Sequence, residues 1–170
     1  LEQGRVAPGG TGAAKAMGNY AGAIYVASNW KAQGFDDVAS LDARHVRYLT
    51  ETSGSNIFLK RRDGKIVTPP LDDQILPGVT RDSTIRVARD ILNLEVEERP
   101  LPVDEVFEEG EELFCTGTAW TVLKVRELVY GNRTKSFEES TTCQALLDNL
   151  RGIQTGTRKD PFGWTFEVGE

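Results

Sequence analysis

The stretch PGGTGAAKAMGNYA at residues 8–21 joins a glycine-rich loop, a lysine and the beginning of a helix. The small residues from Pro8 to Gly12 indicate a loop whose backbone can approach a ligand closely. From Met17 to Gln33, apolar residues recur at spacings of three and four, which predicts an amphipathic helix that ends at Gly34. The residues of this apolar stripe are Tyr20, Ile24, Ala27 and Trp30. We therefore expect Lys15 at the entrance to this helix.

Outward from this stretch, runs of β-branched and aromatic residues predict short strands separated by turns. The expected strands cover residues 38–41, 47–52, 56–60, 65–68, 95–99 and 113–125, the last interrupted by Gly117. Asp63 and Gly64 predict a tight turn, so that the first four strands form a β meander. Helices are expected over residues 80–93, with Thr80 as the N-cap residue, over 103–107 and over 142–154. The pattern predicts one α/β domain.

Composition narrows the functional classes. With 170 residues, of which 39% are hydrophobic, the chain can bury the core of one globular domain. The net charge of −6 is dispersed along the chain, which makes nucleic acid a poor partner. Cys115 and Cys143 have neither zinc-ligand nor disulfide-framework spacing, so we expect no metal and a reducing intracellular compartment. No apolar run approaches the roughly 20 residues of a membrane-spanning helix, so we expect a soluble protein without a membrane partner.

Three glycine-bearing loops, at residues 9–15, 76–80 and 116–119, place Thr or Lys side chains beside backbone amides. Where such a loop precedes a helix, the unpaired N–H groups and the helix dipole favour an anion. Each loop alone is also compatible with an ordinary turn. The three together favour a phosphate site, although neither a P-loop nor a GxGxxG pattern occurs. His45 is the single histidine, and the sequence contains no nucleophile-elbow motif, so no Ser-His-Asp mechanism is expected.

Four ordered segments resemble the conserved segments of fold-type IV pyridoxal-phosphate enzymes, and most closely those of branched-chain-amino-acid aminotransferases. The similar segments are PGGTGAAKAMGNYA at 8–21 for the cofactor lysine, ETSGSNIF at 51–58 for the pyridine nitrogen, TPPLDDQILPGVTR at 68–81 for the phosphate, and FCTGTA at 114–119 for phosphate and substrate. Shorter matches are EER at 97–99 and GIQTG at 152–156. The resemblance therefore extends over nearly the whole chain.

This resemblance implies that Lys15 forms the Schiff base with pyridoxal 5'-phosphate and moves the α-proton, as an amine can. Tyr20 resembles the tyrosine that contacts the phenolic oxygen of the cofactor, with core packing as its alternative. Glu51 resembles the carboxylate that pairs with the protonated pyridine nitrogen, with a solvated strand face as its alternative. Asn56 would support Glu51 through a hydrogen bond. Leu76 would lie against the cofactor ring, or else pack in the core.

The resemblance also assigns the groups that hold the phosphate and the substrate. The implied phosphate cup consists of Val79, Thr80, Gly117 and Thr118. The backbone of Thr118 and Ala119 would meet the substrate carboxylate. Arg81 follows Thr80 directly, but we expect it to be solvated or structural rather than a phosphate ligand.

The implied fold is the large C-terminal domain of this family, an α/β domain whose curved sheet or pseudo-barrel is flanked by helices. The implied activity is amino-group transfer between leucine, isoleucine or valine and 2-oxoglutarate, in a homodimer. Trp120 and the run Leu123-Lys124-Val125 depart from the family pattern, which opens the question of substrate preference. D-amino-acid transaminases and aminodeoxychorismate lyases share Lys15 and Glu51, although PGGTG and GNYA favour the branched-chain type.

The resemblance places the smaller N-terminal domain of the family outside these 170 residues. A catalytically incomplete fragment, or a scaffold, is therefore a further alternative to an active enzyme. The compartment also stays open between cytoplasm, mitochondrion and plastid.

Overall fold

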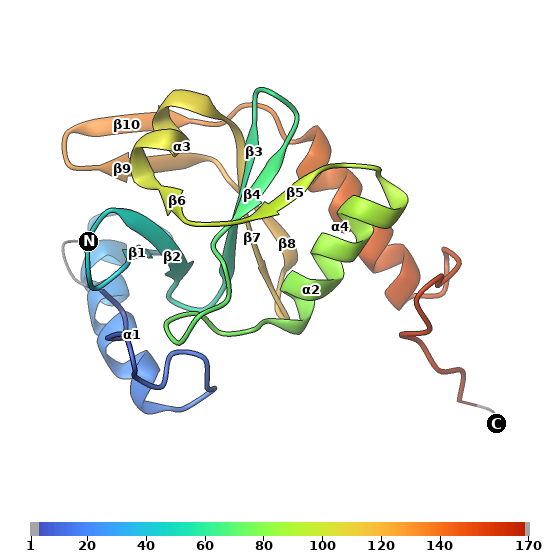
Figure 1. Cartoon of the computed structure of the whole chain (residues 1–170), viewed down its shortest axis with the longest axis horizontal. Coiled ribbons are helices and arrows are strands. Elements are labelled where there is room, and N and C mark those ends of the chain that lie inside the picture. The colour runs from blue at the N-terminus through green and yellow to red at the C-terminus, as the bar shows by residue number, and fades with distance from the viewer. Residues whose placement is uncertain (1–3, 169–170) are drawn as a thin grey trace.

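The computed structural model describes residues 4–168, in which eight strands form one sheet and two more form a separate hairpin (Figure 1). The strands are β1 (Ala39–Leu41), β2 (Tyr48–Thr52), β3 (Asn56–Arg61), β4 (Ile66–Thr68), β5 (Val96–Glu98), β6 (Leu101–Pro102), β7 (Gly110–Gly117), β8 (Thr121–Val125), β9 (Glu127–Tyr130) and β10 (Arg133–Ser136). The helices are α1 (Gly18–Lys31), α2 (Val79–Arg86), its π-helical continuation η1 (Val87–Ile91), α3 (Val103–Glu109) and α4 (Thr141–Gln154).

Strand β3 is the centre of the sheet. It pairs antiparallel with β4 on one side and with β7 on the other, and β8 follows β7 in an antiparallel hairpin. β2 meets β3 only at the pair Glu51–Asn56, where the sheet divides, and β1 and β6 pair with β2. Within residues 4–168 no strand pairing closes the sheet, so the expected curved sheet is observed and a closed barrel is not.

One face of the sheet is covered by α2 and α4, which lie side by side in Figure 1. Phe58 of β3 and Phe114 of β7 are fully buried on this face, with stacked rings whose centroids are 5.3 Å apart. Ile85 of α2 and Leu146 and Leu150 of α4 pack against them. Because α2 is anchored by this core, its first turn is held at a fixed place above the sheet.

The opposite face carries a second apolar cluster. Ile57 and Leu59 of β3 project into it, because side chains alternate between the faces of a strand. Val103 and Val106 of α3 cover this cluster, and Leu128 belongs to the hairpin that borders it. The two clusters together make β3 and β7 the rigid support of the domain.

The expected β meander is confirmed, and so are the strands at 95–99 and 113–125 and the helices at 103–107 and 142–154. Most of the observed ends lie within one or two residues of the expected ones. The hairpin β9–β10 and the short β6 were not anticipated. The turn at Gly131, with a φ of 60°, separates two segments in which half-buried and exposed residues alternate. In the sequence, the pair Gly131-Asn132 between two runs of four residues is the signal that could have revealed the hairpin.

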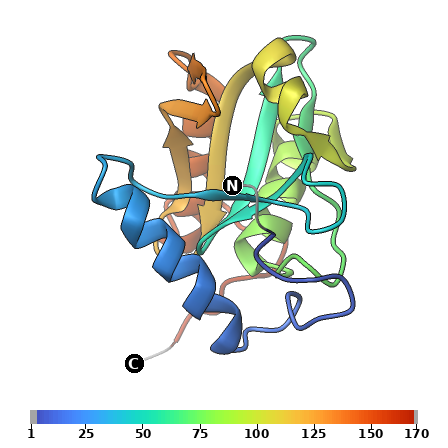
Figure 2. The same ribbon diagram turned by 90° about the vertical axis from the view of Figure 1, so that its left-hand side faces the viewer.

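Helix α1 occurs where it was expected, but its apolar stripe does not face the core. Of the four stripe residues only Ala27 is buried, whereas Ile24 is 60% exposed and Trp30 is 39% exposed in the described part of the chain. The helix is held at its ends instead. Asn19 is buried at its beginning, and the ring of Trp30 makes an edge contact with Phe35 just beyond its end. Helix α1 lies along the outside of the fold (Figure 2), and within residues 4–168 the apolar stripe of this expected amphipathic helix is not buried in the core.

The expectation that Thr80 caps the following helix is also wrong. Gly78 holds the N-cap position of α2, and no side chain caps that end. A Cβ atom on Gly78 would collide with Oδ1 of Asn56, so the close approach of the helix to β3 requires glycine there. Thr80 lies inside the first turn, where a backbone N–H group has no carbonyl partner within the helix.

In the described residues no helix is both long and apolar enough to span a bilayer. The same part of the chain holds no group of three or more His, Cys, Asp or Glu side chains that could bind a metal ion.

Candidate functional site

A cavity of about 220 Å³ lies where β2, β3 and β7 meet the first turn of α2. It is lined by most of the residues that the sequence predicts for a cofactor site. These are Lys15, Tyr20, Glu51, Asn56, Leu76, Val79, Thr80, Gly117 and Thr118. Ala119 is exposed and does not line the cavity. Four segments far apart in the sequence therefore converge on one site.

A row of polar residues crosses the floor of the cavity. Glu51 of β2 lies opposite Asn56 of β3, and Asn56 lies opposite Thr116 of β7. Residues directly opposite one another in neighbouring strands project to the same face. The three side chains therefore share one face, and the row spans two strand spacings, roughly 10 Å.

Glu51 stands at one end of this row, 4% exposed. Its Oε2 accepts hydrogen bonds from Nδ2 of Asn56 and from the backbone N–H of Leu76, both at 3.4 Å. Asn56 also donates to the carbonyl oxygen of Leu76 at 3.0 Å, which fixes its amide. Burial raises the pKa of Glu51 to about 7, and the charge of Arg5 and the N–H of Leu76 lower it only in part. This carboxyl group can thus hold or release a proton near neutral pH.

Arg5 forms an ion pair with Glu51 inside the cavity. Its Nη2 also donates to the backbone carbonyls of Gly12 and Gln74, each at 3.2 Å. The guanidinium lies 6.0 Å from the ring centroid of Tyr20. Arg5 thus ties together the loop before Lys15, the loop before α2, and the buried carboxylate.

Lys15 is exposed at the mouth of the cavity, on a loop with internal support. Asn19 donates to the carbonyl oxygens of Thr11 and Ala14 at 2.6 and 2.9 Å, and accepts from the hydroxyl of Thr11 at 2.6 Å. Gly12 packs so closely on the backbone of residues 73–74 that a Cβ atom there would collide with it. The loop therefore has little freedom to shift, although the amine of Lys15 stays open to the solvent.

The other end of the row offers donors to an anion. The backbone N–H groups of Val79 and Thr80 begin α2 and have no partner within the helix, while Asp82 is the residue whose N–H reaches Gly78. The helix dipole adds positive potential at this point. Gly117 faces the side chain of Ser55 with little room for a Cβ atom, and Thr118 follows it at the rim. This end has the form of an anion site.

The comparisons with known proteins agree with this geometry. The model of the family described as amino-transferase class IV matches residues 5–128, a range that contains every residue of the cavity. This chain belongs to the class IV aminotransferase family.

Its relatives and structural neighbours carry more specific names. Branched-chain amino acid aminotransferase 1 from Humulus lupulus, a mitochondrial protein, is 43% identical over 166 residues, which cover 96% of this chain and 42% of that protein. Branched-chain-amino-acid aminotransferase 2 of Bacillus subtilis is 40% identical over 172 residues, covering 96% and 47%.

A solved structure gives the same result. The branched-chain amino acid aminotransferase of Escherichia coli has a TM-score of 0.84 and 31% identity, covering 96% of this chain and 52% of that chain. The chain therefore spans about half the length of the proteins that it matches.

Several residues of this class IV site were missed by the sequence reasoning. Arg5, Thr116 and the turn residues 53–55 line the cavity as well. Arg5 lies in the loop before the lysine with no local pattern that marks it, since its partners are up to 69 residues away. Thr116 stands in the quoted FCTGTA segment, and its strand alternation with Phe114 is the signal that could have found it.

Two residues outside the phosphate assignment are structural or exposed. Arg81 is buried and donates to the carbonyl oxygen of Pro69 at 2.8 Å and to Glu98 at 3.0 Å, so the structural alternative is observed. His45 has a largely exposed side chain, and its Nδ1 lies 3.0 Å from Oδ2 of Asp42 in the β1–β2 turn, away from the cavity. Neither contributes to the site.

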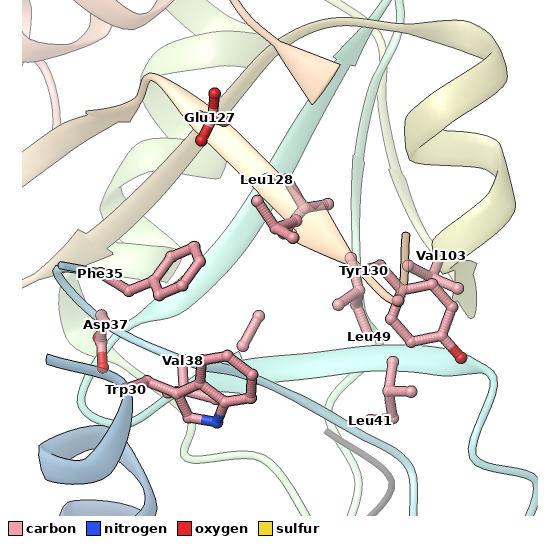
Figure 3. A pocket seen from close by; sticks show the side chains of 13 residues that line it. Trp30, Phe35, Asp37, Val38, Leu41, Leu49, Val103, Glu127, Leu128 and Tyr130 are labelled. Atoms are coloured by element: carbon pink, nitrogen blue, oxygen red, sulfur yellow. The ribbon is translucent and has the colours of Figure 1, made fainter. Parts of the chain in front are cut away.

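A second and larger cavity, of about 800 Å³, lies between the segment after α1 and the hairpin β9–β10 (Figure 3). Its walls are mostly apolar, with Trp30 and Phe35 on one side and Leu128 and Tyr130 on the other (Figure 3). None of the predicted cofactor or substrate residues lines it.

Proposed function

We propose that these residues form the pyridoxal-phosphate-binding part of a branched-chain-amino-acid aminotransferase, with Lys15 as the residue that holds the cofactor. The observation that carries the proposal is the row from Glu51 to Thr116. It joins a buried carboxyl group at one end to an anion site at the other, over roughly 10 Å. A flat pyridine ring with a phosphate arm needs these two features at opposite ends, with an amine at the rim between them.

The donor set fits such a cofactor. Among the similar solved structures, the Thermobaculum terrenum branched-chain amino acid aminotransferase is in its PLP-form, and a further branched-chain amino acid aminotransferase is bound to pyridoxamine 5'-phosphate. In this chain, Val79, Thr80 and Thr118 would hold the phosphate group, and Leu76 would lie against the ring. The orphaned Oγ1 of Thr116 in the cavity wall is a further sign that the site lacks a polar partner.

When bound, the cofactor supplies a conjugated ring that accepts the electron pair released at the substrate α-carbon. Glu51, as a carboxylate, would hold a proton at the ring nitrogen, because its buried negative charge favours the protonated form of the ring. Asn56 and the N–H of Leu76 orient that carboxyl group. Lys15 takes and returns the α-proton at its Nζ. Tyr20 orients the cofactor ring through a contact with the phenolic oxygen of the cofactor.

The substrate proposal rests on the named relatives. We infer that the whole protein transfers amino groups between leucine, isoleucine or valine and 2-oxoglutarate, and that it works as a homodimer. The backbone of Thr118 and Ala119 would meet the substrate carboxylate. D-amino-acid transamination or aminodeoxychorismate cleavage would use the same Lys15 and Glu51, so the amino acid consumed distinguishes these alternatives.

The experiment is borohydride reduction of the chain with excess pyridoxal phosphate, followed by peptide mass mapping. We expect one cofactor mass, on the peptide that contains Lys15, and no adduct with Lys15→Ala. Lys31, at the far end of α1, is the matched control, because Lys31→Ala should keep the adduct. A label on another lysine, or none under saturating cofactor, would exclude Lys15 from the proposed role.

A further inference from the structure

Thr116 has a buried hydroxyl group without a partner. The residue is 1% exposed, and its Oγ1 makes no hydrogen bond to any residue that the structure describes. An unsatisfied buried hydroxyl is costly, and native proteins seldom tolerate one without a reason. Thr68, on strand β4, is a useful contrast, since its equally buried hydroxyl donates to the carbonyl oxygen of Ile57 at 2.8 Å.

The position of Thr116 directs its side chain to the cavity. It pairs with Asn56 on one side and Val122 on the other, and it shares their face of the sheet. Phe114, two residues earlier on this face, fills the core under α2. Thr116 is thus the point on β7 where the apolar core ends and the cavity begins, and it is one of the cavity-lining residues.

The surroundings indicate which partner the hydroxyl takes. The backbone N–H groups at the beginning of α2 are donors, and Thr80 and Thr118 line the cavity with their own hydroxyl-bearing side chains. The one carboxylate in the cavity wall, Glu51, is already engaged by Arg5 and stands two strands away. Several donors that converge on one space need an acceptor with several oxygen atoms, as a phosphate group has.

We propose that the Thr116 hydroxyl is a direct ligand of the phosphate group bound in this cavity and makes the site select phosphorylated over unphosphorylated ligands. This inference deepens the proposed function, on which it rests for the identity of the cofactor. The hydroxyl donates to a phosphate oxygen, beside the N–H groups of Val79 and Thr80. Its partner in the protein is missing because the ligand supplies it.

The test measures dissociation constants of pyridoxal phosphate, pyridoxal and inorganic phosphate for the wild-type chain, Thr116→Val and Thr116→Ser. Valine keeps the shape and removes the hydroxyl, so pyridoxal phosphate and inorganic phosphate should bind roughly tenfold more weakly or worse, since hydrogen bonds to charged groups are the strong class. Pyridoxal should bind unchanged. Serine, which keeps the hydroxyl, should restore most of the phosphate affinity.

A matched pair of variants tests that the effect is not structural. In the ligand-free chain, Thr116→Val should unfold at the same or a higher urea concentration than wild type, because it removes an unsatisfied group. Thr68→Val, which removes a hydroxyl that has a partner, should unfold earlier and leave phosphate affinity unchanged.

The outcomes separate the two proposals. If Thr116→Val binds inorganic phosphate as tightly as wild type, or if wild type binds none, the Thr116 assignment is wrong. If Thr116→Val loses phosphate affinity but the wild-type chain forms no reducible adduct at Lys15, the assignment is supported and the proposed cofactor role fails. Equal losses for pyridoxal and pyridoxal phosphate would overturn it, since the hydroxyl would then not act on the phosphate.

Discussion

Glu51 illustrates how one buried group can serve both the structure and the chemistry. Its carboxyl group is inside the protein because β2 places it opposite Asn56, and Arg5 reaches it from a loop 46 residues earlier in the chain. The ion pair offsets only part of the cost of burial, so the pKa of Glu51 stays at about 7 rather than at its ordinary 4.5. This placement suits a group that pairs with a protonated ring nitrogen, because the positive charge on the ring would stabilise the charged form of the Glu51 carboxyl group.

This pKa predicts how the stability of the cofactor-free chain depends on pH. Because the folded-state pKa of Glu51 is raised from 4.5 to about 7, the folded state binds more protons than the unfolded state between these values. The free energy of unfolding should therefore fall as pH rises through this window, by about 3 kcal/mol in total. Urea unfolding at half-unit steps from pH 4.5 to 7.5 measures the slope.

Two variants check the origin of that slope. Glu51→Gln cannot titrate, so the fall across this window should largely disappear, whatever the absolute stability of the variant. Arg5→Gln removes the cation and should extend the fall to higher pH. A slope that survives in Glu51→Gln would assign the titration to another group.

At the scale of elements, helix α4 depends on a residue from a distant strand. Glu112 of β7 is 2% exposed, and its carboxylate accepts the backbone N–H groups of Thr142 and Cys143, each at 2.9 Å. A carboxylate at a helix N-terminus satisfies unpaired N–H groups and complements the helix dipole. Glu112 thus fixes α4 to the sheet, and α4 in turn supports α2 and the anion site.

We predict that Glu112→Ala lowers the free energy of unfolding by about 3 kcal/mol, because two charge-assisted hydrogen bonds are lost and two N–H groups are left unpaired. The neighbouring Glu111 is the control. It pairs with Lys60 at 2.8 Å nearer the surface, so Glu111→Ala should cost less than about 1 kcal/mol. Equilibrium urea unfolding of both variants decides the matter, and equal losses would contradict the capping role.

At the scale of the whole molecule, the site is open on the side of α1. Lys15 is exposed, and the outward residues Ile24 and Tyr25 of α1 present apolar surface, as does Trp120 beside the cavity. The chain spans about half the length of the relatives that it matches.

From this openness we predict little turnover by the 170 residues alone, supplied with leucine and 2-oxoglutarate, even when the cofactor is bound. Rates should be lower by at least roughly 100-fold than those of the same residues joined to an N-terminal domain of a branched-chain relative, because orientation and water exclusion each contribute large factors. Glutamate formation is the measurement. Comparable activity of the two proteins would show that the cavity described above suffices for catalysis.

The sequence by itself determined the order of most elements and most of the residues that line the cavity. Local rules identify the meander, the Gly64 turn and the helix after Lys15, because hydrophobic period and turn residues act over a few positions. The family resemblance then named nine residues that line one cavity in the structure. Ala119, which it also named, lies outside the cavity wall.

Only the tertiary structure decided the rest. Arg5 reaches Glu51 and Glu112 caps α4 across gaps of 46 and about 30 residues, and no local pattern encodes such partners. Gly78, and not Thr80, is the N-cap of α2, and Asn56, on a neighbouring strand, leaves no room for a side chain at that position. The apolar stripe of α1 shows the same limit, because a period of 3.6 identifies a face but does not say what covers it. Burial, ion pairs and unsatisfied hydroxyls are properties of neighbours in space, so they are fixed only when the chain has folded.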